Sequence, residues 1–370
     1  MPAQEDRDSA PERAMGLVDL PPRPVVPEVC HQRPVPEVFG LRPSAVPEVR
    51  RWRTASVPEV RRLARAAGYA AEAPLVVGTS WRDAPPIFAC AGRTPAGRPF
   101  DEHTLAYAAS LSKQFVAALT ALVMRRGGLA VDEPLSRRMP ELPAWAQSVR
   151  LRHLLHHIGG LPGDDLVDRA LTGDRTGSGV LAALRALPEP AASPGTEYAY
   201  SNAGYVCLAE AVSRAAGAAL PALADQLLFA PLGLTATRFW DGPEPAPPGA
   251  AALSPGAPAP LSLGDGGLWS TAADLLRWAD ALNDSRLGVS GLLQAPGRLD
   301  DGTTLDYAWG MGVRRRHGLT VYRHGGGWPG VRTLLARVPD RGLGVIVTAL
   351  DDDTERTVAL TDGLLDLLLS

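Results

Sequence analysis

The clearest apolar pattern in this 370-residue chain is a stripe between positions 110 and 126 that repeats at intervals of three to four residues. The stripe consists of Leu111, Phe115, Leu119, Leu122 and Val123. This spacing places the apolar side chains on one face of an α-helix, and two glycines at positions 127 and 128 end it. Similar patterns predict helices over residues 150–157, 202–216, 271–283 and 353–369, whereas the Pro/Ala/Gly-rich residues 242–260 are expected to form a loop.

Short runs rich in β-branched and aromatic residues predict strands near both ends of the folded part. Residues 75–78 and 87–92 form a first pair, joined by a turn that contains Pro85 and Pro86. Four further runs occupy residues 305–314, 319–324, 331–338 and 343–350. This arrangement is typical of an α+β fold, in which an antiparallel β-sheet is flanked by helices and interrupted by a large, mostly helical insertion.

The first 65 residues differ from the rest because a short motif repeats within them. The motif Val-Pro-Glu-Val begins at Val26, Val35, Val46 and Val57. Proline blocks helix continuation, and aromatic residues are scarce here. We therefore expect residues 1–65 to be a disordered arm and residues 66–370 to form the folded domain, although residues 61–65 can begin a short helix. The arm is interpreted as a solvated tail, as a docking element for a protein partner, or as a recognition sequence inside a processed peptide.

The bulk composition disfavours several classes of protein. Apolar residues make up 45% of the chain, charged residues make up 21%, and the formal net charge is −3. These values are ordinary for a globular protein and do not favour nucleic-acid binding. The first 22 residues lack the apolar run of an export signal, and no later run is long enough to span a bilayer. We therefore expect a cytoplasmic protein with no membrane partner.

Cysteines and histidines do not indicate a metal or cofactor site. Cys30, Cys90 and Cys207 are scattered along the chain and are interpreted as reduced thiols. His153 and His157 lie four residues apart, but the glutamate of the zinc-protease motif is missing. We therefore expect neither a metal nor a cofactor.

Lysine occurs once among the 37 basic residues, at Lys113, and all the others are arginine. A lysine amine can lose its proton when it is desolvated, whereas a guanidinium effectively cannot. Ser110 lies three residues earlier, so both side chains share one face in the first turn of the predicted helix. Free N–H groups at a helix start stabilise an oxyanion and disfavour a protonated lysine. Ser-x-x-Lys is an arrangement that activates a serine nucleophile; the alternative is that chance left one lysine on a solvated helix face.

Two further motifs follow in the chain. A Tyr-Ser-Asn motif at residues 200–202 precedes a predicted helix, and a His-Gly-Gly-Gly motif at residues 324–327 forms the turn between two predicted strands. Each alone is typical of a helix N-cap or of an ordinary hairpin. Together with the Ser-x-x-Lys motif, in this order over about residues 70–370, they resemble the serine β-lactamase-like superfamily. Within it they are most similar to class C β-lactamases, serine D-alanyl-D-alanine carboxypeptidases and related esterases.

The resemblance implies a catalytic role for three residues. Ser110 would attack a carbonyl carbon and form an acyl-enzyme. Lys113 would accept or relay the serine proton. Tyr200 would share that role, because a phenolate forms more easily beside a charged lysine.

The resemblance also implies a set of substrate-binding residues. Asn202 would hydrogen-bond the acyl side of the substrate and orient Lys113. His324 would hold the place of the lysine or histidine that begins the third motif, and Gly326 would let the strand edge approach the substrate. The backbone N–H groups of Ser110 and Gly327 would form the oxyanion hole. His157 corresponds to a histidine that is usually structural in the family.

Three sites depart from the family pattern, and the first is Ile158-Gly159-Gly160, which stands where the family often has Thr-x-Ser-Gly and would reshape the cleft floor. A neutral His324 holds a substrate carboxylate less well than lysine does, which weakens the case for a β-lactamase. Trp328 stands where smaller residues are common and would narrow the acyl pocket or stack on substrate. The resemblance favours a serine hydrolase that acts on an ester or a small peptide amide. The alternatives are a β-lactamase or D,D-carboxypeptidase, an acyltransferase or peptide cyclase, and a non-catalytic binding protein on the same fold.

Overall fold

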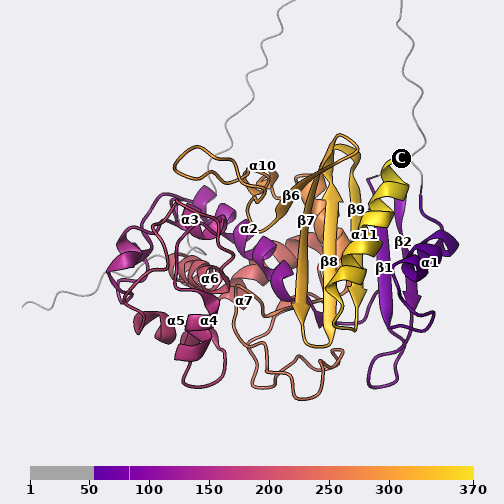
Figure 1. Ribbon diagram of the computed structural model, residues 1–370, viewed down its shortest axis with the longest axis horizontal. Helices are drawn as coiled ribbons and strands as arrows, with labels where there is room; N and C mark the ends of the chain where they lie inside the picture. The colour runs from indigo at the N-terminus through magenta and orange to yellow at the C-terminus, as the bar shows by residue number, and fades with distance from the viewer. Residues whose placement is uncertain (1–53, 83) are drawn as a thin grey trace, which may run out of the picture.

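The computed structural model describes residues 54–82 and 84–370, and these residues are built around a six-stranded antiparallel sheet (Figure 1). In spatial order its strands are β2 (Ala84–Ala91), β1 (Leu75–Trp81), β9 (Leu343–Ala349), β8 (Val331–Val338), β7 (Leu319–Trp328) and β6 (Gly312–Arg316). A small three-stranded sheet contains β3 (Ala106–Tyr107), β5 (Leu268–Ser270) and β4 (Arg238–Phe239). The predicted α+β fold with an antiparallel sheet is confirmed.

Helices cover both faces of the large sheet. The helices are α1 (Val57–Ala66), α2 (Ser112–Arg125), α3 (Leu151–Leu155), α4 (Asp164–Ala170), α5 (Gly177–Arg185), α6 (Asn202–Ala216), α7 (Leu220–Ala224), α8 (Ala230–Leu232), α9 (Ala272–Asn283), α10 (Ser290–Leu293) and α11 (Thr354–Leu369). One face of the sheet packs against α1 and α11, and the other packs against α9 and the helical region (Figure 1). Successive side chains of a strand point to opposite faces. Consequently Val76 belongs to one hydrophobic cluster, while its neighbours Leu75 and Val77 belong to the other.

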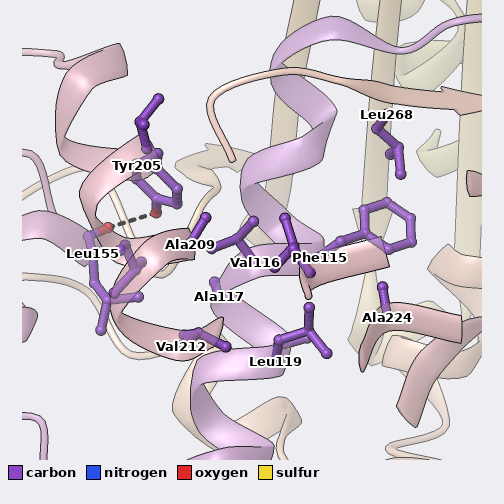
Figure 2. Close-up of a cluster of buried hydrophobic side chains, with 14 of the residues drawn as sticks. Phe115, Val116, Ala117, Leu119, Leu155, Tyr205, Ala209, Val212, Ala224 and Leu268 are labelled. Carbon is purple, nitrogen blue, oxygen red and sulfur yellow. Dashed lines mark hydrogen bonds between the residues drawn. The ribbon is translucent and has the colours of Figure 1, made fainter. Parts of the chain in front are cut away.

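Helix α2 is the buried centre of the helical region. Its Phe115, Val116 and Leu119 are fully buried, and they pack among side chains from several other elements (Figure 2). These partners include Leu155 of α3, Val212 of α6, Ala224 of α7 and Leu268 of β5. A helix enclosed on nearly all sides is a rigid platform, because close-packed interiors resist displacement. Residues at the start of α2 are therefore held firmly in place.

The folded part begins earlier than the predicted boundary at residue 66. Residues 57–66 form α1, whose first turn is the fourth Val-Pro-Glu-Val copy. Ser56 caps this helix, and Glu59 completes a reciprocal capping box. Val60 is buried in the cluster that α1 shares with α11, so this copy is part of the domain. The other three copies, and with them most of the predicted arm, lie outside the described residues.

Two of the predicted strands begin at other residues in the structure, namely β2 and β6. Pro85 and Pro86 lie within β2 rather than in a turn. Because β2 is an edge strand, it tolerates the missing N–H groups. Residues 305–311 precede β6, which starts only at Gly312. By contrast, the helix predicted over residues 202–216 matches α6 in both limits.

The third motif is also placed differently from the prediction. Residues 324–327 were expected to form a turn, but they belong to β7, which continues to Trp328. The reversal occurs at Pro329 and Gly330, between Trp328 and Val331. The glycines therefore form part of a strand and not a flexible loop.

Among the described residues, no single helix is long and apolar enough to cross a membrane. One sharply bent pair, Asn202–Ala216 with Leu220–Leu232, meets the criterion by length and composition alone.

Candidate active site

Ser110 lies in a short 3₁₀ turn, Ala109–Leu111, that leads directly into α2. Ala109 has a positive φ of 48°, a conformation that costs energy for a residue with a side chain. The residues after Ser110 are fixed by a distant segment of the chain, because Ser112 Oγ lies 2.8 Å from the carbonyl oxygens of both Gly264 and Gly266. The serine is thus presented on a strained but firmly held turn.

Lys113 is fully buried, and its amine contacts three groups. Nζ lies 2.8 Å from Asn202 Oδ1, 2.9 Å from the backbone oxygen of Asp265 and 3.1 Å from Ser110 Oγ. The first two partners can only accept hydrogen bonds. A neutral amine has two N–H groups and one lone pair. When both N–H groups serve these acceptors, the lone pair is left to face Ser110 Oγ.

The surroundings of Lys113 favour this neutral form. Burial lowers the pKa of its ammonium group to about 8, even though the carboxylates of Asp265 and Asp164 oppose the shift. The rings of Tyr200 and Tyr205, with centroids 4.9 and 5.7 Å from Nζ, favour the charged form by cation–π attraction, but the effect of burial is larger. A substantial fraction of the lysine is therefore unprotonated at a mildly alkaline pH.

Tyr200 lies beside Ser110 and Lys113, as the sequence predicted, but its phenol does not ionise readily. Burial around the hydroxyl raises the pKa of Tyr200 well above its ordinary value, and a hydrogen bond with Ser110 offsets this only in part. The expected phenolate is thus disfavoured. The geometry makes Lys113 the better proton acceptor and leaves Tyr200 as a proton-bearing phenol.

Asn202 is the first residue of α6, and its side chain bridges two charged groups. Its Oδ1 faces Lys113, while its Nδ2 donates to Asp164 Oδ2 at 2.8 Å. Asp164 was not among the residues singled out from the sequence. It begins α4, far from Asn202 in the chain, so no local pattern marks it.

His324 belongs to a hydrogen-bonded chain with Tyr307 and His157. The hydroxyl of Tyr307 lies 3.1 Å from Nε2 of both histidines. His157 Nδ1 accepts the Ser201 N–H, so in the neutral ring Nε2 carries the proton and donates to Tyr307. His324 Nδ1 donates to the Gly325 carbonyl, so its Nε2 accepts from Tyr307. Both ring nitrogens of His324 are therefore engaged within the protein.

The two histidines that hydrogen-bond Tyr307 remain uncharged. Burial, assisted by the nearby Lys113, lowers the pKa of His324 to about 3. Burial also places the pKa of His157 well below its ordinary value. Tyr307 was missed in the sequence analysis, because nothing in its local sequence indicates that it lies between two distant histidines.

The glycines of β7 lie along a free strand edge. Pairing with β6 ends at Arg323, so later residues of β7 pair only with β8. Trp328 and Val331 flank a two-residue turn, so their backbones form a hydrogen-bonded pair. Along β7 and β8, hydrogen-bonded and non-hydrogen-bonded residue pairs then alternate, which makes Gly327 and Arg332 a non-hydrogen-bonded pair. This alternation turns the N–H of Gly327 away from β8, toward the free edge of β7.

Gly326 allows β7 to approach the nucleophile turn closely. A Cβ atom on Gly326 would lie 2.4 Å from the backbone oxygen of Ala108 and 3.2 Å from the Cβ of Ala109. No side chain fits there unless the backbone moves. The strand that carries Gly327 is thus held against the turn that carries Ser110, and the backbone N–H groups of these two residues are the ones expected to form an oxyanion hole.

A pocket of about 770 Å³ opens beside the free edge of β7. Its lining includes Tyr198, Tyr200, Tyr307, His324 and the three glycines, together with residues from the start of α11. Trp328 is not part of this lining. Its Nε1 donates to the Pro258 carbonyl at 2.9 Å, and its ring edge contacts Tyr107. Trp328 therefore anchors the 242–260 segment to β7.

Within the described residues, no group of three or more His, Cys, Asp and Glu side chains is arranged to hold a metal ion. Cys90 and Cys207 are free thiols, and Cys30 lies outside the described part of the chain.

The fold and the Ser110–Lys113 pair define a class of serine enzymes. In this class the nucleophilic serine stands at the start of a buried helix, and a lysine follows it by three residues. The chain belongs to the β-lactamase family, whose model matches residues 80–369. This match covers most of the chain, and it includes all three motifs.

Comparisons with individual proteins agree with this membership. Penicillin-binding protein 4* of Bacillus subtilis is 28% identical over 306 residues, which cover 71% of this chain and 64% of that relative. Esterase EstB of Burkholderia gladioli is 36% identical over 161 residues, covering 39% of this chain and 41% of the esterase. The crystal structure of D-amino acid amidase from Ochrobactrum anthropi superposes with a TM-score of 0.69 at 20% identity, covering 85% of this chain and 97% of the amidase. This last likeness concerns the fold alone.

Proposed function

We propose that this protein is a serine hydrolase that cleaves an ester or a small peptide amide through an acyl-enzyme. The observation that carries the proposal is the 3.1 Å contact between Ser110 Oγ and the Nζ of the fully buried Lys113. A nucleophile within hydrogen-bond reach of a base, with the base itself oriented by further groups, is the arrangement that covalent catalysis needs. The names of the relatives, an esterase and D-aminopeptidases among them, support the same reaction class.

The first half of the reaction follows from the geometry. Ser110 Oγ attacks the substrate carbonyl carbon while its proton passes to Lys113 Nζ. The carbonyl oxygen becomes an oxyanion, which the N–H groups of Ser110 and Gly327 stabilise. The bond to the leaving group then breaks as the leaving atom takes the proton from Lys113. The phenol of Tyr200 keeps its proton and donates a hydrogen bond to the side chain of Ser110.

The second half repeats the same steps with water. A water molecule attacks the acyl carbon, gives its proton to Lys113, and Ser110 Oγ recovers that proton as the ester bond breaks. An amine in place of water would yield acyl transfer or cyclisation. No contact among the described residues favours that outcome, so hydrolysis is the reaction we propose.

The leaving-group side of the site is suited to an uncharged group. His324 is neutral, and neither of its ring nitrogens is free for a substrate carboxylate. Three arginines line the pocket. Arg314 lies at its exposed side, where its Nη1 donates to the Val313 carbonyl at 2.9 Å, and the other two are engaged inside the protein. Arg323 pairs with Asp362 at 2.8 Å, and Arg332 donates to the Trp328 carbonyl at 2.7 Å. A carboxylate buried against His324 would find no free partner there, which is costly, so His324 disfavours a D,D-carboxypeptidase that releases a free amino acid.

Covalent labelling tests the assignment of the nucleophile. A fluorophosphonate probe is expected to label the wild-type protein at Ser110 and to leave Ser110→Ala unlabelled, because Ser110 Oγ lies 3.1 Å from the buried amine of Lys113. Ser178→Ala, which changes an exposed serine of α5, serves as the matched control and should label like wild type. Equal labelling of wild type and Ser110→Ala, read by mass spectrometry of the modified peptide, would show that the nucleophile lies elsewhere.

A matched pair of substrates tests the preference for an uncharged leaving group. A short peptide with a C-terminal carboxamide is expected to be cleaved with a kcat/KM about tenfold or more above that of the same peptide with a free carboxylate. This ratio corresponds to a difference of about 1.4 kcal/mol in transition-state stabilisation. In His324→Lys, which supplies a cation, the difference should shrink. A wild-type preference for the free acid would instead support the carboxypeptidase alternative.

A further inference from the structure

Asp164 makes an unusual set of contacts at the start of α6. Its carboxylate accepts the backbone N–H of Asn202 at 3.0 and 3.1 Å, the backbone N–H of Ala203 at 3.1 Å and the Asn202 side-chain amide at 2.8 Å. The helix already has an N-cap of its own, because Ser201 Oγ accepts the N–H of Gly204. Asp164 therefore does more than satisfy a helix end, since it also grips the side chain that faces Lys113.

The identities of its two neighbours leave Asn202 only one amide orientation. The Asp164 carboxylate only accepts hydrogen bonds, so it requires the Nδ2 end of the amide whatever the charge of Lys113, and the ammonium form of Lys113, which only donates, requires the Oδ1 end. Asn202 must therefore present Oδ1 to Lys113 and Nδ2 to Asp164. In this orientation, Asn202 Oδ1 and the Asp265 carbonyl occupy both N–H groups of the neutral amine, and the lone pair faces Ser110.

We propose that Asp164 is a positioning residue, which acts through Asn202 to aim the lone pair of Lys113 at Ser110. The inference rests on the proposed function, in which Lys113 accepts the serine proton. An asparagine at position 164 offers both a donor and an acceptor, so the amide of Asn202 could then turn around. With Nδ2 facing Lys113, the neutral amine would accept that hydrogen bond with its lone pair, which would no longer face Ser110.

Charge gives this role a signature that a purely structural residue would lack. The charged groups around Lys113 are Asp164 and Asp265, whose carboxylates favour the ammonium form, and Arg175, which opposes it. His157, His324, Tyr200 and Tyr205 also face the amine, and all four are neutral near pH 7. Loss of the Asp164 charge therefore lowers the pKa of Lys113, and the acid limb of the pH–rate profile moves to lower pH.

The test compares Asp164→Asn with the neighbouring Asp165→Asn in the full-length protein, using a nitrophenyl ester. Asp165 is largely exposed and pairs with Arg169 on the same helix, which makes it a matched control. For Asp164→Asn we expect kcat to fall roughly 10- to 100-fold with KM within about threefold, because misplacing a reacting group by about 1 Å costs up to about 100-fold. We also expect the acid limb to move to lower pH. Asp165→Asn should match wild type in all three measurements.

The outcomes separate this inference from the proposed function. Wild-type kcat and an unmoved acid limb in Asp164→Asn would overturn the positioning role while leaving the hydrolase assignment intact. No esterase activity in wild type, or activity that survives in Ser110→Ala, would overturn the proposed function itself. If Asp164→Asn does not fold, as judged by thermal melting, Asp164→Ser keeps a small capping oxygen without the charge. The same fall in kcat and the same shift of the acid limb are expected for it, and their absence would overturn the inference.

Discussion

Lys113→Arg is expected to lower kcat for an ester substrate by roughly 1,000-fold, although it preserves the positive charge. General-base catalysis contributes about 100- to 10,000-fold, and a guanidinium cannot give up its proton near neutral pH. The buried amine has one geometry that serves two fixed acceptors and Ser110, and a planar guanidinium cannot reproduce it. Steady-state kinetics on the folded variant provides the measurement. Arg62→Lys on the exposed surface of α1 exchanges the same two residue types and should leave kcat unchanged.

The pH dependence of the wild-type protein belongs to the same prediction. Since burial lowers the pKa of Lys113 to about 8, the amine is mostly protonated below that pH and mostly neutral above it. The value of kcat/KM is therefore expected to rise as the pH passes through about 8, and this limb should be missing in the residual activity of Lys113→Arg. A flat profile between pH 6 and 9, or near wild-type turnover in the arginine variant, would show that another group accepts the proton.

Gly326→Ala is expected to reduce kcat by roughly 100- to 1,000-fold, which is the cost of losing one oxyanion-hole donor. The added Cβ would lie 2.4 Å from the Ala108 carbonyl oxygen, and both atoms belong to backbone-anchored segments that cannot yield separately. The strand must therefore move away from the turn that carries Ser110. The N–H of Gly327 would move with it, so that the two donors no longer converge on one oxygen atom.

Two other glycines provide the comparison for this variant. At Gly325 the nearest atom to an added Cβ is the Thr333 carbonyl oxygen at 3.7 Å, an ordinary contact, so Gly325→Ala should lose far less activity. Gly291 in α10 has no atom within 4 Å of an added Cβ, so Gly291→Ala should behave as wild type. Equal losses in Gly325→Ala and Gly326→Ala would mean that close approach of the strand is not what positions the donor.

Much of the architecture could be predicted from local patterns. The helical stripe beginning at Leu111 and the capped segment beginning at Asn202 correspond to α2 and α6, because burial of one apolar face and helix-end signals are both local properties. Errors arose where the outcome depended on neighbours in space. Pro85 and Pro86 fit into β2 only because that strand lies at the sheet edge. The glycines at 325–327 belong to β7 because β8 pairs with them along their whole length.

The residues of the site also fall into two groups, those marked by a local motif and those that only the fold brings together. Ser110, Lys113, Tyr200 and Asn202 carry recognisable motifs, and the fold brings all four together. Asp164 and Tyr307 carry no motif, because their partners lie well outside their local sequence: Asn202 is 38 positions from Asp164, and His324 and His157 are 17 and 150 positions from Tyr307. Nor could the sequence show that burial would favour a neutral Lys113 and a protonated Tyr200, because a pKa depends on the surrounding atoms.

By itself, the sequence determined which reactive groups are available and that a serine precedes the sole lysine by three residues at the start of an amphipathic helix. These features follow from residue identity and from the helical repeat. Only the tertiary structure decided which group lies within reach of the Ser110 proton and which atoms surround that group. The aim of the Lys113 lone pair depends on Asn202 Oδ1 and the Asp265 carbonyl, and the neutral state of His324 depends on burial beside Tyr307. Proton transfer requires atoms at hydrogen-bond distance, and in this chain the folding of distant segments sets those distances.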